Sequence, residues 1–211
     1  MGVMHDNEQL VRTAQRHGLL SDRVINAMRA VDRAWFVPDG LPPAEIYDDR
    51  PIQIGAGQTT SQPSLVAAMV DALQISGRDT VLEVGAGLGY QTALLSHLAA
   101  RVVSIELHSS LVSQAVSRLK RAGIENVAVY QANAWNSLPE PGPFAGIVVS
   151  AAADSVPEPL SQSLAEEGRM VIPLGPGGSE IVMIYEKHGG MLRKVRKLTG
   201  ARFVPLSHDD K

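Results

Sequence analysis

The chain has 211 residues, of which 45% are hydrophobic and 19% charged, so it holds enough apolar material for a core and too little charge for a disordered chain. Its formal net charge of −3 disfavours non-specific nucleic-acid binding, and the absence of cysteine excludes disulfides, thiolate nucleophiles and Cys-ligated metals. Apolar runs are too short for a membrane span, and Met1–Asp6 does not resemble a leader, which predicts a soluble, cytoplasmic protein.

Helices and one long loop are predicted in the first third of the chain. Asp6 and Ser21 each precede apolar residues at helical spacing and can cap a helix, and Gly18 ends the first one. Residues 38–57 are rich in Pro and Gly without periodicity, which is typical of a functional loop. Pro63 then suits the first turn of a third helix.

From residue 79 onward, strands and helices alternate. The pattern predicts strands over 80–84, 102–106, 127–130 and 147–150, and helices over 90–98 and 111–122. Such alternation predicts an α/β fold with a doubly wound, mostly parallel sheet and helices on both faces.

The last part of the chain is predicted to be antiparallel. A hairpin is expected over 180–186 and 191–198, and a final edge strand over 202–206. We expect a single domain over residues 1–211, in which a helical and irregular part (1–60) precedes the α/β part (61–211).

Three glycines, Gly85, Gly87 and Gly89, lie between a predicted strand and a predicted helix. Glycine lets the backbone turn sharply and approach a ligand, and the helix N-terminus offers free N–H groups. Glu106 ends the next strand, where a carboxylate can accept hydrogen bonds from ribose hydroxyls. The combination favours a nucleotide-binding site over a merely tight turn.

The kind of nucleotide follows from two further positions. Tyr90 stands where the dinucleotide fingerprint has its third glycine. Glu83, two residues before Gly85, is expected to repel phosphate and to favour a cationic ligand. S-adenosylmethionine, with an ammonium, a sulfonium, a ribose and no phosphate, fits both.

A hydroxyl-rich segment, Ile54-Gly55-Ala56-Gly57-Gln58-Thr59-Thr60-Ser61-Gln62-Pro63, precedes the third helix. By itself it favours helix capping by Ser61 or Gln62. The segment resembles, however, the G-x-G-Q-T-I-S-Q-P signature of protein-L-isoaspartate O-methyltransferases, and the glycine loop resembles their V-L-E-[IV]-G-x-G-x-G-Y. Further similarities extend the resemblance over nearly the whole chain, from Ala27-Met28-Arg29-Ala30-Val31 and Phe36-Val37-Pro38 to Ile172-Pro173-Leu174-Gly175 and Arg202-Phe203-Val204-Pro205-Leu206.

The resemblance implies the Rossmann-like fold of class I methyltransferases and methyl transfer from S-adenosylmethionine to the α-carboxylate of L-isoaspartyl residues in damaged proteins or peptides. The ester then closes to a succinimide, which hydrolyses partly to normal aspartate. Ser61 matches the active-site serine, and Arg202 is the candidate cation for the substrate carboxylate. The implied cofactor-binding set is Thr59, Thr60, Glu83, Gly85, Ala86, Gly87, Glu106, Leu107, Ala132, Asn133 and Ser207, and the substrate-binding set is Thr59, Ser61, Arg202 and Val204.

Several catalytic groups are not needed for this chemistry. A carboxylate with a pKa near 4 is already anionic at neutral pH, so its attack on a methyl group needs no general base. No metal is expected, because the six histidines lack ligand spacing. The partners expected are isoaspartyl proteins or peptides and neither nucleic acid nor membrane, and the expected state is a monomer.

The chain departs from the family pattern at three places. The family's G-D-G reads Ala132-Asn133-Ala134, the aspartate after Pro-Phe is Ala145, and the P-R before F-V-P is Asp32-Arg33. The first two changes are expected on the adenine side of the cofactor cleft, which predicts weakened cofactor binding.

Four alternatives stay open from the sequence. A nicotinamide oxidoreductase would use the same glycine loop, but no Tyr-x-x-x-Lys set is present. A cofactor-binding module without catalysis and a methyltransferase for a normal Asp in a dedicated peptide both accommodate the departures. An RNA methyltransferase would use the cations of residues 187–202, although their alternation with apolar residues favours a solvated hairpin face.

Overall fold

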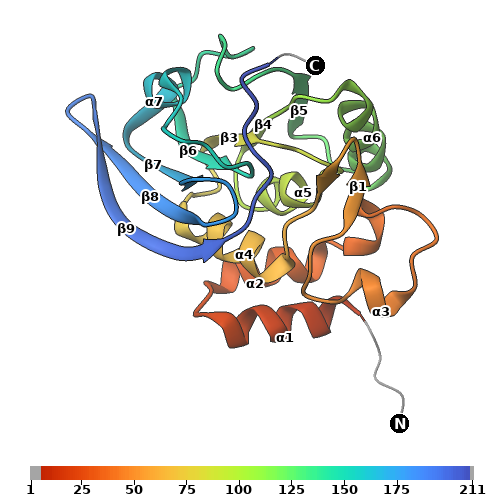
Figure 1. The fold of residues 1–211 in the computed structure, drawn as a ribbon. Helices are drawn as coiled ribbons and strands as arrows, with labels where there is room; N and C mark the ends of the chain where they lie inside the picture. Colours follow the sequence, from red (N-terminus) through yellow and green to blue (C-terminus); the bar gives the residue numbers. More distant parts are fainter. Residues whose placement is uncertain (1–5, 210–211) are drawn as a thin grey trace.

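The computed structural model describes residues 6–209, so the Met1–His5 stretch lies outside the described residues. At its centre is a seven-stranded sheet of order β5-β4-β3-β6-β7-β8-β9 (Figure 1). The strands span Thr80–Val84 (β3), Arg101–Glu106 (β4), Val127–Gln131 (β5), Phe144–Val149 (β6), Leu164–Leu174 (β7), Glu180–His188 (β8) and Met191–Ala201 (β9). β3 to β7 pair in parallel, and β8 and β9 add antiparallel strands, as the sequence predicted.

The helices cover the two faces of the sheet unequally. They span Asn7–His17 (α1), Asp22–Ala30 (α2), Arg33–Phe36 (η1, a 3₁₀ turn), Pro43–Ile46 (α3), Pro63–Ala72 (α4), Tyr90–Ser96 (α5), Ser109–Arg121 (α6) and Glu158–Ser163 (α7). Buried residues of α1, α2, α4, α5 and α6 share one apolar cluster with one face of the sheet. The other face packs against α7 and against loop residues such as Trp135 and Leu206.

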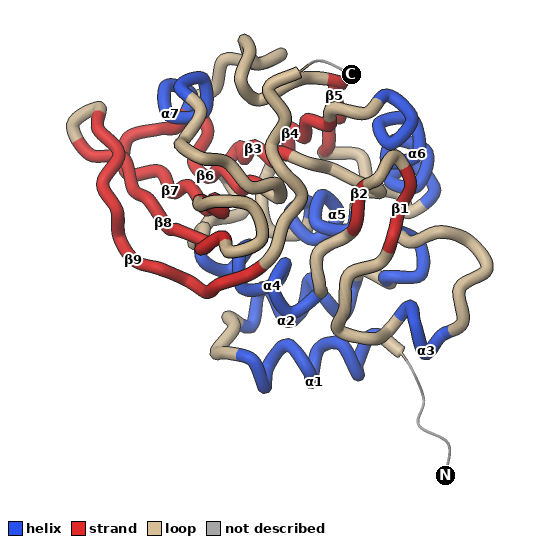
Figure 2. The backbone as a smooth tube through the Cα atoms, viewed as in Figure 1, coloured by secondary structure: helices blue, strands red, loops and turns tan. Residues whose placement is uncertain are grey.

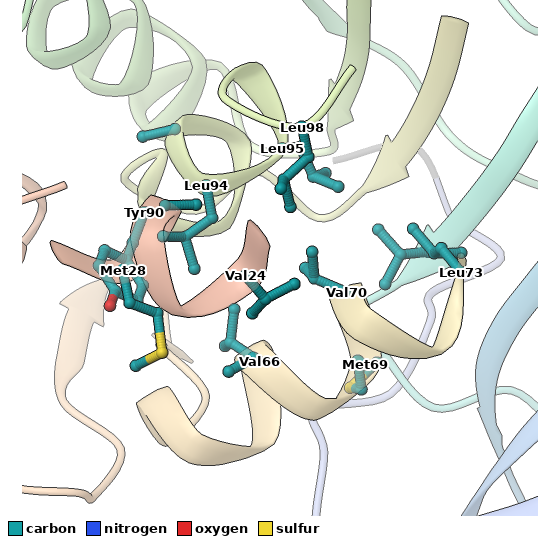
Figure 3. Close-up of a cluster of buried hydrophobic side chains, with 14 of the residues drawn as sticks. Val24, Met28, Val66, Met69, Val70, Leu73, Tyr90, Leu94, Leu95 and Leu98 are labelled. Atoms are coloured by element: carbon teal, nitrogen blue, oxygen red, sulfur yellow. The ribbon is translucent and has the colours of Figure 1, made fainter. Parts of the chain in front are cut away.

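The N-terminal helices form because their caps and apolar stripes agree. The Asp6 carboxylate accepts from the Gln9 N–H at 3.1 Å, and the Ser21 hydroxyl accepts from the Val24 N–H at 3.4 Å. The predicted apolar residues of α1 and α2 are buried. Figure 3 shows Val24 and Met28 of α2 packed with side chains of α4 and α5. This packing fixes the N-terminal part of the chain against the α/β part.

The structure differs from the predictions in several segments, among them three near the site. The predicted loop 38–57 contains α3 and the short strand β1 (Gln53–Gly55), which pairs with β2 (Gln58–Thr59). β7 was not predicted, because Gly168 and Pro173 interrupt its apolar pattern. The predicted strand over 202–206 is wrong: the chain leaves the sheet after β9 and makes one isolated bridge, between Ala152 and Pro205.

None of the described helices is both long enough and apolar enough to cross a membrane.

Candidate active site

A cleft of about 530 Å³ lies at the carboxyl ends of β3, β4 and β6. The glycine loop forms its floor, the β1–β2 hairpin one wall, and the C-terminal segment (residues 202–209) another. Figure 1 shows this segment running from the end of β9 across the front of the sheet. Open α/β sheets bind ligands at this edge.

A smaller cavity of about 230 Å³ adjoins the cleft beside α4 and the end of β9. The two cavities adjoin each other, and molecules bound in them would meet at the residues that line both. These shared residues are Thr59, Thr60, Ser61, Ser150, Phe203 and Val204.

The glycine loop adopts the backbone conformation for which its glycines are needed. Gly85, Gly87 and Gly89 have φ values of 92°, 57° and 96°, a region that side-chain-bearing residues rarely adopt. A Cβ on Gly87 would also lie 3.1 Å from the Ile54 Cδ1 of the hairpin wall. The backbone of the glycine loop therefore faces the cleft without side chains at Gly85 and Gly87.

Glu106 lies at the end of β4, where the sequence predicted it. One carboxylate oxygen accepts from the Gly87 N–H and the other from the His108 N–H, both at 3.0 Å. The side chain thus ties the glycine loop to β4. It also lines the cleft, where its remaining lone pairs can accept hydrogen bonds from hydroxyl groups.

Glu83 does not line either cavity, contrary to its predicted place in the cofactor-binding set. Glu83 is fully buried, because β3 lies in the middle of the sheet and both of its faces are covered. Burial raises the pKa of Glu83 to about 7, against hydrogen bonds donated by Ser104, Thr92 and Gln91. Gln91 also donates to the Ser150 hydroxyl at 2.9 Å, so Glu83 reaches the cleft only through Gln91.

Thr60 is held in place by a buried arginine that the sequence analysis did not single out for a role. Arg33 is 1% exposed, and its guanidinium donates to the carbonyls of Ile46, Asp48 and Arg50 and to the Thr60 hydroxyl, the last at 3.4 Å. Its burial lowers the Arg33 pKa. Arg33 thereby fixes the loop before β1 against the cleft wall.

Ser61 is not the cap of α4. The Asp49 carboxylate accepts from both the Ser64 N–H at 2.8 Å and the Ser64 hydroxyl at 2.6 Å. Gln62, at the N-cap position, makes no capping side-chain bond. Within the described residues the Ser61 hydroxyl has no hydrogen-bond partner, and Ser61 lines both cavities. Helix capping therefore does not explain this hydroxyl.

Asn133 also lines the cleft, and its side-chain oxygen accepts from the Trp135 N–H at 3.1 Å. Neither Ala132 nor Ala134 has a positive φ, so alanine fits where the family pattern has glycine. Ala145 lies near the amino end of β6, away from the cleft at the other end of the strand. The prediction that Ala145 touches the adenine side is wrong.

The C-terminal segment is anchored at several points. The Ala152 N–H donates to Val204 at 2.8 Å, and the Leu206 N–H donates to Ala152 at 2.6 Å. The Trp135 indole donates to the Leu206 carbonyl and stacks on His208, with ring centroids 4.0 Å apart. The segment carries Arg202 to the smaller cavity, Ser207 to the cleft and Val204 to both.

Glu180 was missed by sequence reasoning, because a lone glutamate at the start of a strand gives no signal. It is 1% exposed and lines the cleft. Its carboxylate accepts from the Phe203 N–H at 3.2 Å and from the Gly178 N–H. Burial acts to raise the Glu180 pKa, but these backbone N–H bonds outweigh it and the net shift is downward. Glu180 thus holds the C-terminal segment where it leaves β9.

The predicted residues are therefore largely brought together. The cleft is lined by Thr59, Thr60, Ser61, Gly85, Ala86, Gly87, Glu106, Leu107, Ala132, Asn133, Val204 and Ser207. Arg202 lies in the smaller cavity, and its Nε donates to the Gly178 carbonyl at 3.3 Å.

The family model of the protein-L-isoaspartate(D-aspartate) O-methyltransferases matches residues 5–211. The chain belongs to this family. A relative from Nitrosococcus oceani, protein-L-isoaspartate O-methyltransferase 2, is 46% identical over 188 residues, which cover 89% of this chain and 85% of the relative. A protein-L-isoaspartate O-methyltransferase from Anaeromyxobacter dehalogenans is 45% identical over 193 residues, covering 90% and 92% of the two chains.

Solved structures of protein-L-isoaspartate O-methyltransferases agree with this fold. A Plasmodium falciparum structure in complex with S-adenosyl-L-homocysteine has a TM-score of 0.83 at 26% identity and covers 97% of this chain and 99% of its own. A second protein-L-isoaspartate O-methyltransferase structure has a TM-score of 0.87 at 27% identity, covering 97% of this chain and 67% of its own. The family's fold thus extends over almost the whole chain.

Proposed function

We propose that this chain transfers a methyl group from S-adenosylmethionine to the α-carboxylate of L-isoaspartyl residues in proteins or peptides, which starts their repair through a succinimide. The observation that carries this proposal is the meeting of two cavities at Thr59–Ser61. The glycine loop and Glu106 line the larger cavity, and Arg202 lines the smaller one. In this arrangement a cofactor and a carboxylate substrate approach each other at Ser61.

The residues of the larger cavity fit S-adenosylmethionine. Its volume of about 530 Å³ lies within the range of small-molecule sites. Glu106 offers a carboxylate to ribose hydroxyls, and the bare backbone of Gly85 and Gly87 allows close approach. We assign the cofactor contacts to Thr59, Thr60, Gly85, Ala86, Gly87, Glu106, Leu107, Ala132, Asn133 and Ser207. When bound, S-adenosylmethionine supplies a methyl group on a positively charged sulfur.

The chain's own residues then bind and orient the substrate. The isoaspartyl carboxylate is already ionised at neutral pH, so no residue has to remove a proton. The Ser61 hydroxyl donates to this carboxylate and fixes its direction, while Thr59 and Val204 shape the passage between the cavities. Arg202 supplies the positive charge that draws the carboxylate in. Positioning and exclusion of water account for most of the acceleration.

Methyl incorporation tests this function directly. The purified chain is incubated with labelled S-adenosylmethionine and a peptide that contains one isoaspartyl residue, and base-labile release of labelled methanol measures the ester. We expect turnover on the isoaspartyl peptide and none on the matched aspartyl peptide. Turnover on the aspartyl peptide alone would instead indicate an enzyme for a normal Asp, and cofactor binding without turnover would indicate a non-catalytic module.

We further propose that residues 1–211 act as one domain, as a monomer in the cytoplasm. The packing of α1 and α2 against α4 and α5 supports the single domain. Light scattering coupled to gel filtration measures the mass, and a mass of two chains would contradict the monomer.

A further inference from the structure

Three exposed cations of β9, Lys194, Arg196 and Lys197, form what we call the basic edge. β9 is the outermost strand of the sheet, and no described strand pairs with its free side (Figure 2). Among residues 6–209, no carboxylate lies within 4.0 Å of these three cations, whereas Arg29, Arg101 and Arg169 each contact one. The three cations of the basic edge therefore form no ion pair within the described residues.

Most charged side chains near the basic edge have partners of their own. At the hairpin tip, Glu166 accepts from the N–H groups of Gly189 and Gly190, and Glu167 and Glu186 contact His188. Arg193 stands opposite Glu186 in the strand pairing. The Lys187 ammonium donates to three backbone carbonyls, those of Ser161, Gln162 and Leu164. Lys187 therefore does not belong to the basic edge. Arg193 forms no ion pair within the described residues either, but it is left out of the basic edge because its partner across the strands is a carboxylate.

Along β9, the basic edge is followed directly by residues that line the smaller cavity, where we place the substrate. Thr199, Gly200 and Ala201, the last residues of β9, line the smaller cavity beside Ser61 and Arg202. β9 bulges twice here, so Thr199, Lys197 and Lys194 stand opposite Val182, Met183 and Tyr185 of β8. At a rise of about 3.3 Å per residue of β8, Lys197 lies about 3 Å and Lys194 about 10 Å along the sheet from Thr199. An extended polypeptide beside β9 has the same rise, so its residues about one to three positions from the one in the cavity reach the basic edge.

Cations stand on both faces of β9. Arg196 pairs with Ile184, while Lys197 pairs with Met183 and Lys194 with Tyr185. Paired residues share a face and successive residues of β8 alternate, so Arg196 lies on one face and the two lysines on the other. Side chains of a polypeptide added at this edge also alternate between the two faces of the sheet. An acidic side chain on either face would therefore lie near a cation of the basic edge.

We propose that the basic edge selects substrates that carry acidic residues about one to three positions from the isoaspartyl residue. The inference rests on the proposed function, since it concerns the polypeptide that brings the carboxylate to the cavity. It makes Lys194, Arg196 and Lys197 specificity-determining residues that do not touch the reacting atoms. A polypeptide is favoured over a nucleic acid because the edge offers unpaired backbone groups next to the cavity, and the net charge of the chain is −3.

Peptide pairs with the same isoaspartyl core test this inference. One peptide has two Glu in the flanks, one has two Ala and one has two Lys, each placed on the N-terminal or the C-terminal side. We expect kcat/KM at low salt to be about two- to fivefold higher for each well-placed Glu than for Ala, and lower for Lys. The preference should fade near about 0.5 M salt, where exposed charges are screened.

The variant Arg196→Glu/Lys197→Glu should lose or reverse this preference and keep its kcat/KM on the Ala peptide. The matched control is Arg78→Glu/Lys120→Glu, which changes the net charge equally at exposed positions outside both cavities, and it should keep the preference. Equal kcat/KM for Glu and Ala peptides with the unmodified chain would overturn the proposal, even if the β9 variant failed to fold. An oligonucleotide that inhibits methylation of the Ala peptide with a Ki below the KM for the Glu peptide would also overturn the proposal, in favour of a nucleic-acid ligand. No turnover on any peptide would instead contradict the proposed function.

Discussion

At the scale of single residues, the Ser61 hydroxyl can be tested separately from helix capping, since the Asp49 carboxylate caps α4 by accepting from Ser64. We expect Ser61→Ala to lower kcat/KM about tenfold or more, because an oriented hydrogen bond to the attacking carboxylate is worth about 1–3 kcal/mol. Thermal unfolding should be unchanged. Steady-state kinetics and calorimetry measure the two effects.

Ser64→Ala is the matched control, because it removes the neighbouring hydroxyl at the helix start. The Ser64 hydroxyl donates to Asp49, so the loss of this hydrogen bond should lower stability by about 1 kcal/mol and leave kcat/KM intact. Ser61→Ala and Ser64→Ala variants with the same profile would remove the distinction between substrate binding and capping.

Glu106 is expected to act on cofactor affinity more than on turnover. Its carboxylate would contact ribose hydroxyls equally in the ground state and the transition state, and it also holds the Gly87 N–H. In Glu106→Ala we expect the Kd for S-adenosylmethionine to rise while kcat at saturation changes little. Isothermal titration and saturation kinetics check this, and a loss confined to kcat would place Glu106 away from the ribose.

Asn133 tests whether the family pattern can be carried over at the end of β5. An aspartate there would keep an oxygen for the Trp135 N–H and add a charge, and hydrogen bonds to ionised groups are about twice as strong as neutral ones. Asn133→Asp should therefore tighten S-adenosylmethionine binding several-fold, or by about 1 kcal/mol. An unchanged or raised Kd would show that the pocket is already matched to asparagine.

At the scale of elements, the C-terminal segment depends on Glu180. Its carboxylate fixes the Phe203 N–H next to Arg202, so Glu180 is a positioning residue for the substrate cavity. We expect Glu180→Ala to raise the KM for an isoaspartyl peptide more than it lowers kcat. Glu180→Gln, which keeps an acceptor oxygen, should restore most of the affinity. A general loss of stability without this KM effect would reduce Glu180 to a structural role.

The elements show why some features could be predicted from sequence and others could not. Local signals sufficed for the caps of α1 and α2 and for the glycine loop, whose positive φ values require glycine. The contact between Arg33 and Thr60 joins residues 27 positions apart, and no local pattern reports it. Glu83 was misplaced because strand position does not show to which face a side chain points. The path of residues 202–206 depends on Glu180, which only the folded sheet brings near.

At the scale of the whole molecule, Glu83 should make stability depend on pH. Burial raises its pKa from 4.5 to about 7, so between these values the folded chain holds a proton that the unfolded chain has lost. Stability is therefore expected to fall as the pH rises through this window, by about 3 kcal/mol in total.

Glu83→Gln should remove this fall, since glutamine does not titrate. Urea unfolding at about pH 5 and about pH 8 measures it, and the control is Glu140→Gln, which alters an exposed pair with Arg101. A pH dependence that persists unchanged in Glu83→Gln would mean that Glu83 is ionised in the core.

The free side of β9 also bears on how copies of this chain behave toward one another. An 11-residue strand with unpaired backbone groups and exposed Met191 and Val195 is a template on which a second copy could add its own strand. Like charges on two such strands repel, so we expect the cations of the basic edge also to oppose growth of the sheet between molecules. Neutralising them with alanine would invite aggregation, whereas reversing them to glutamate preserves the repulsion. The same three side chains can thus serve substrate choice and solubility together.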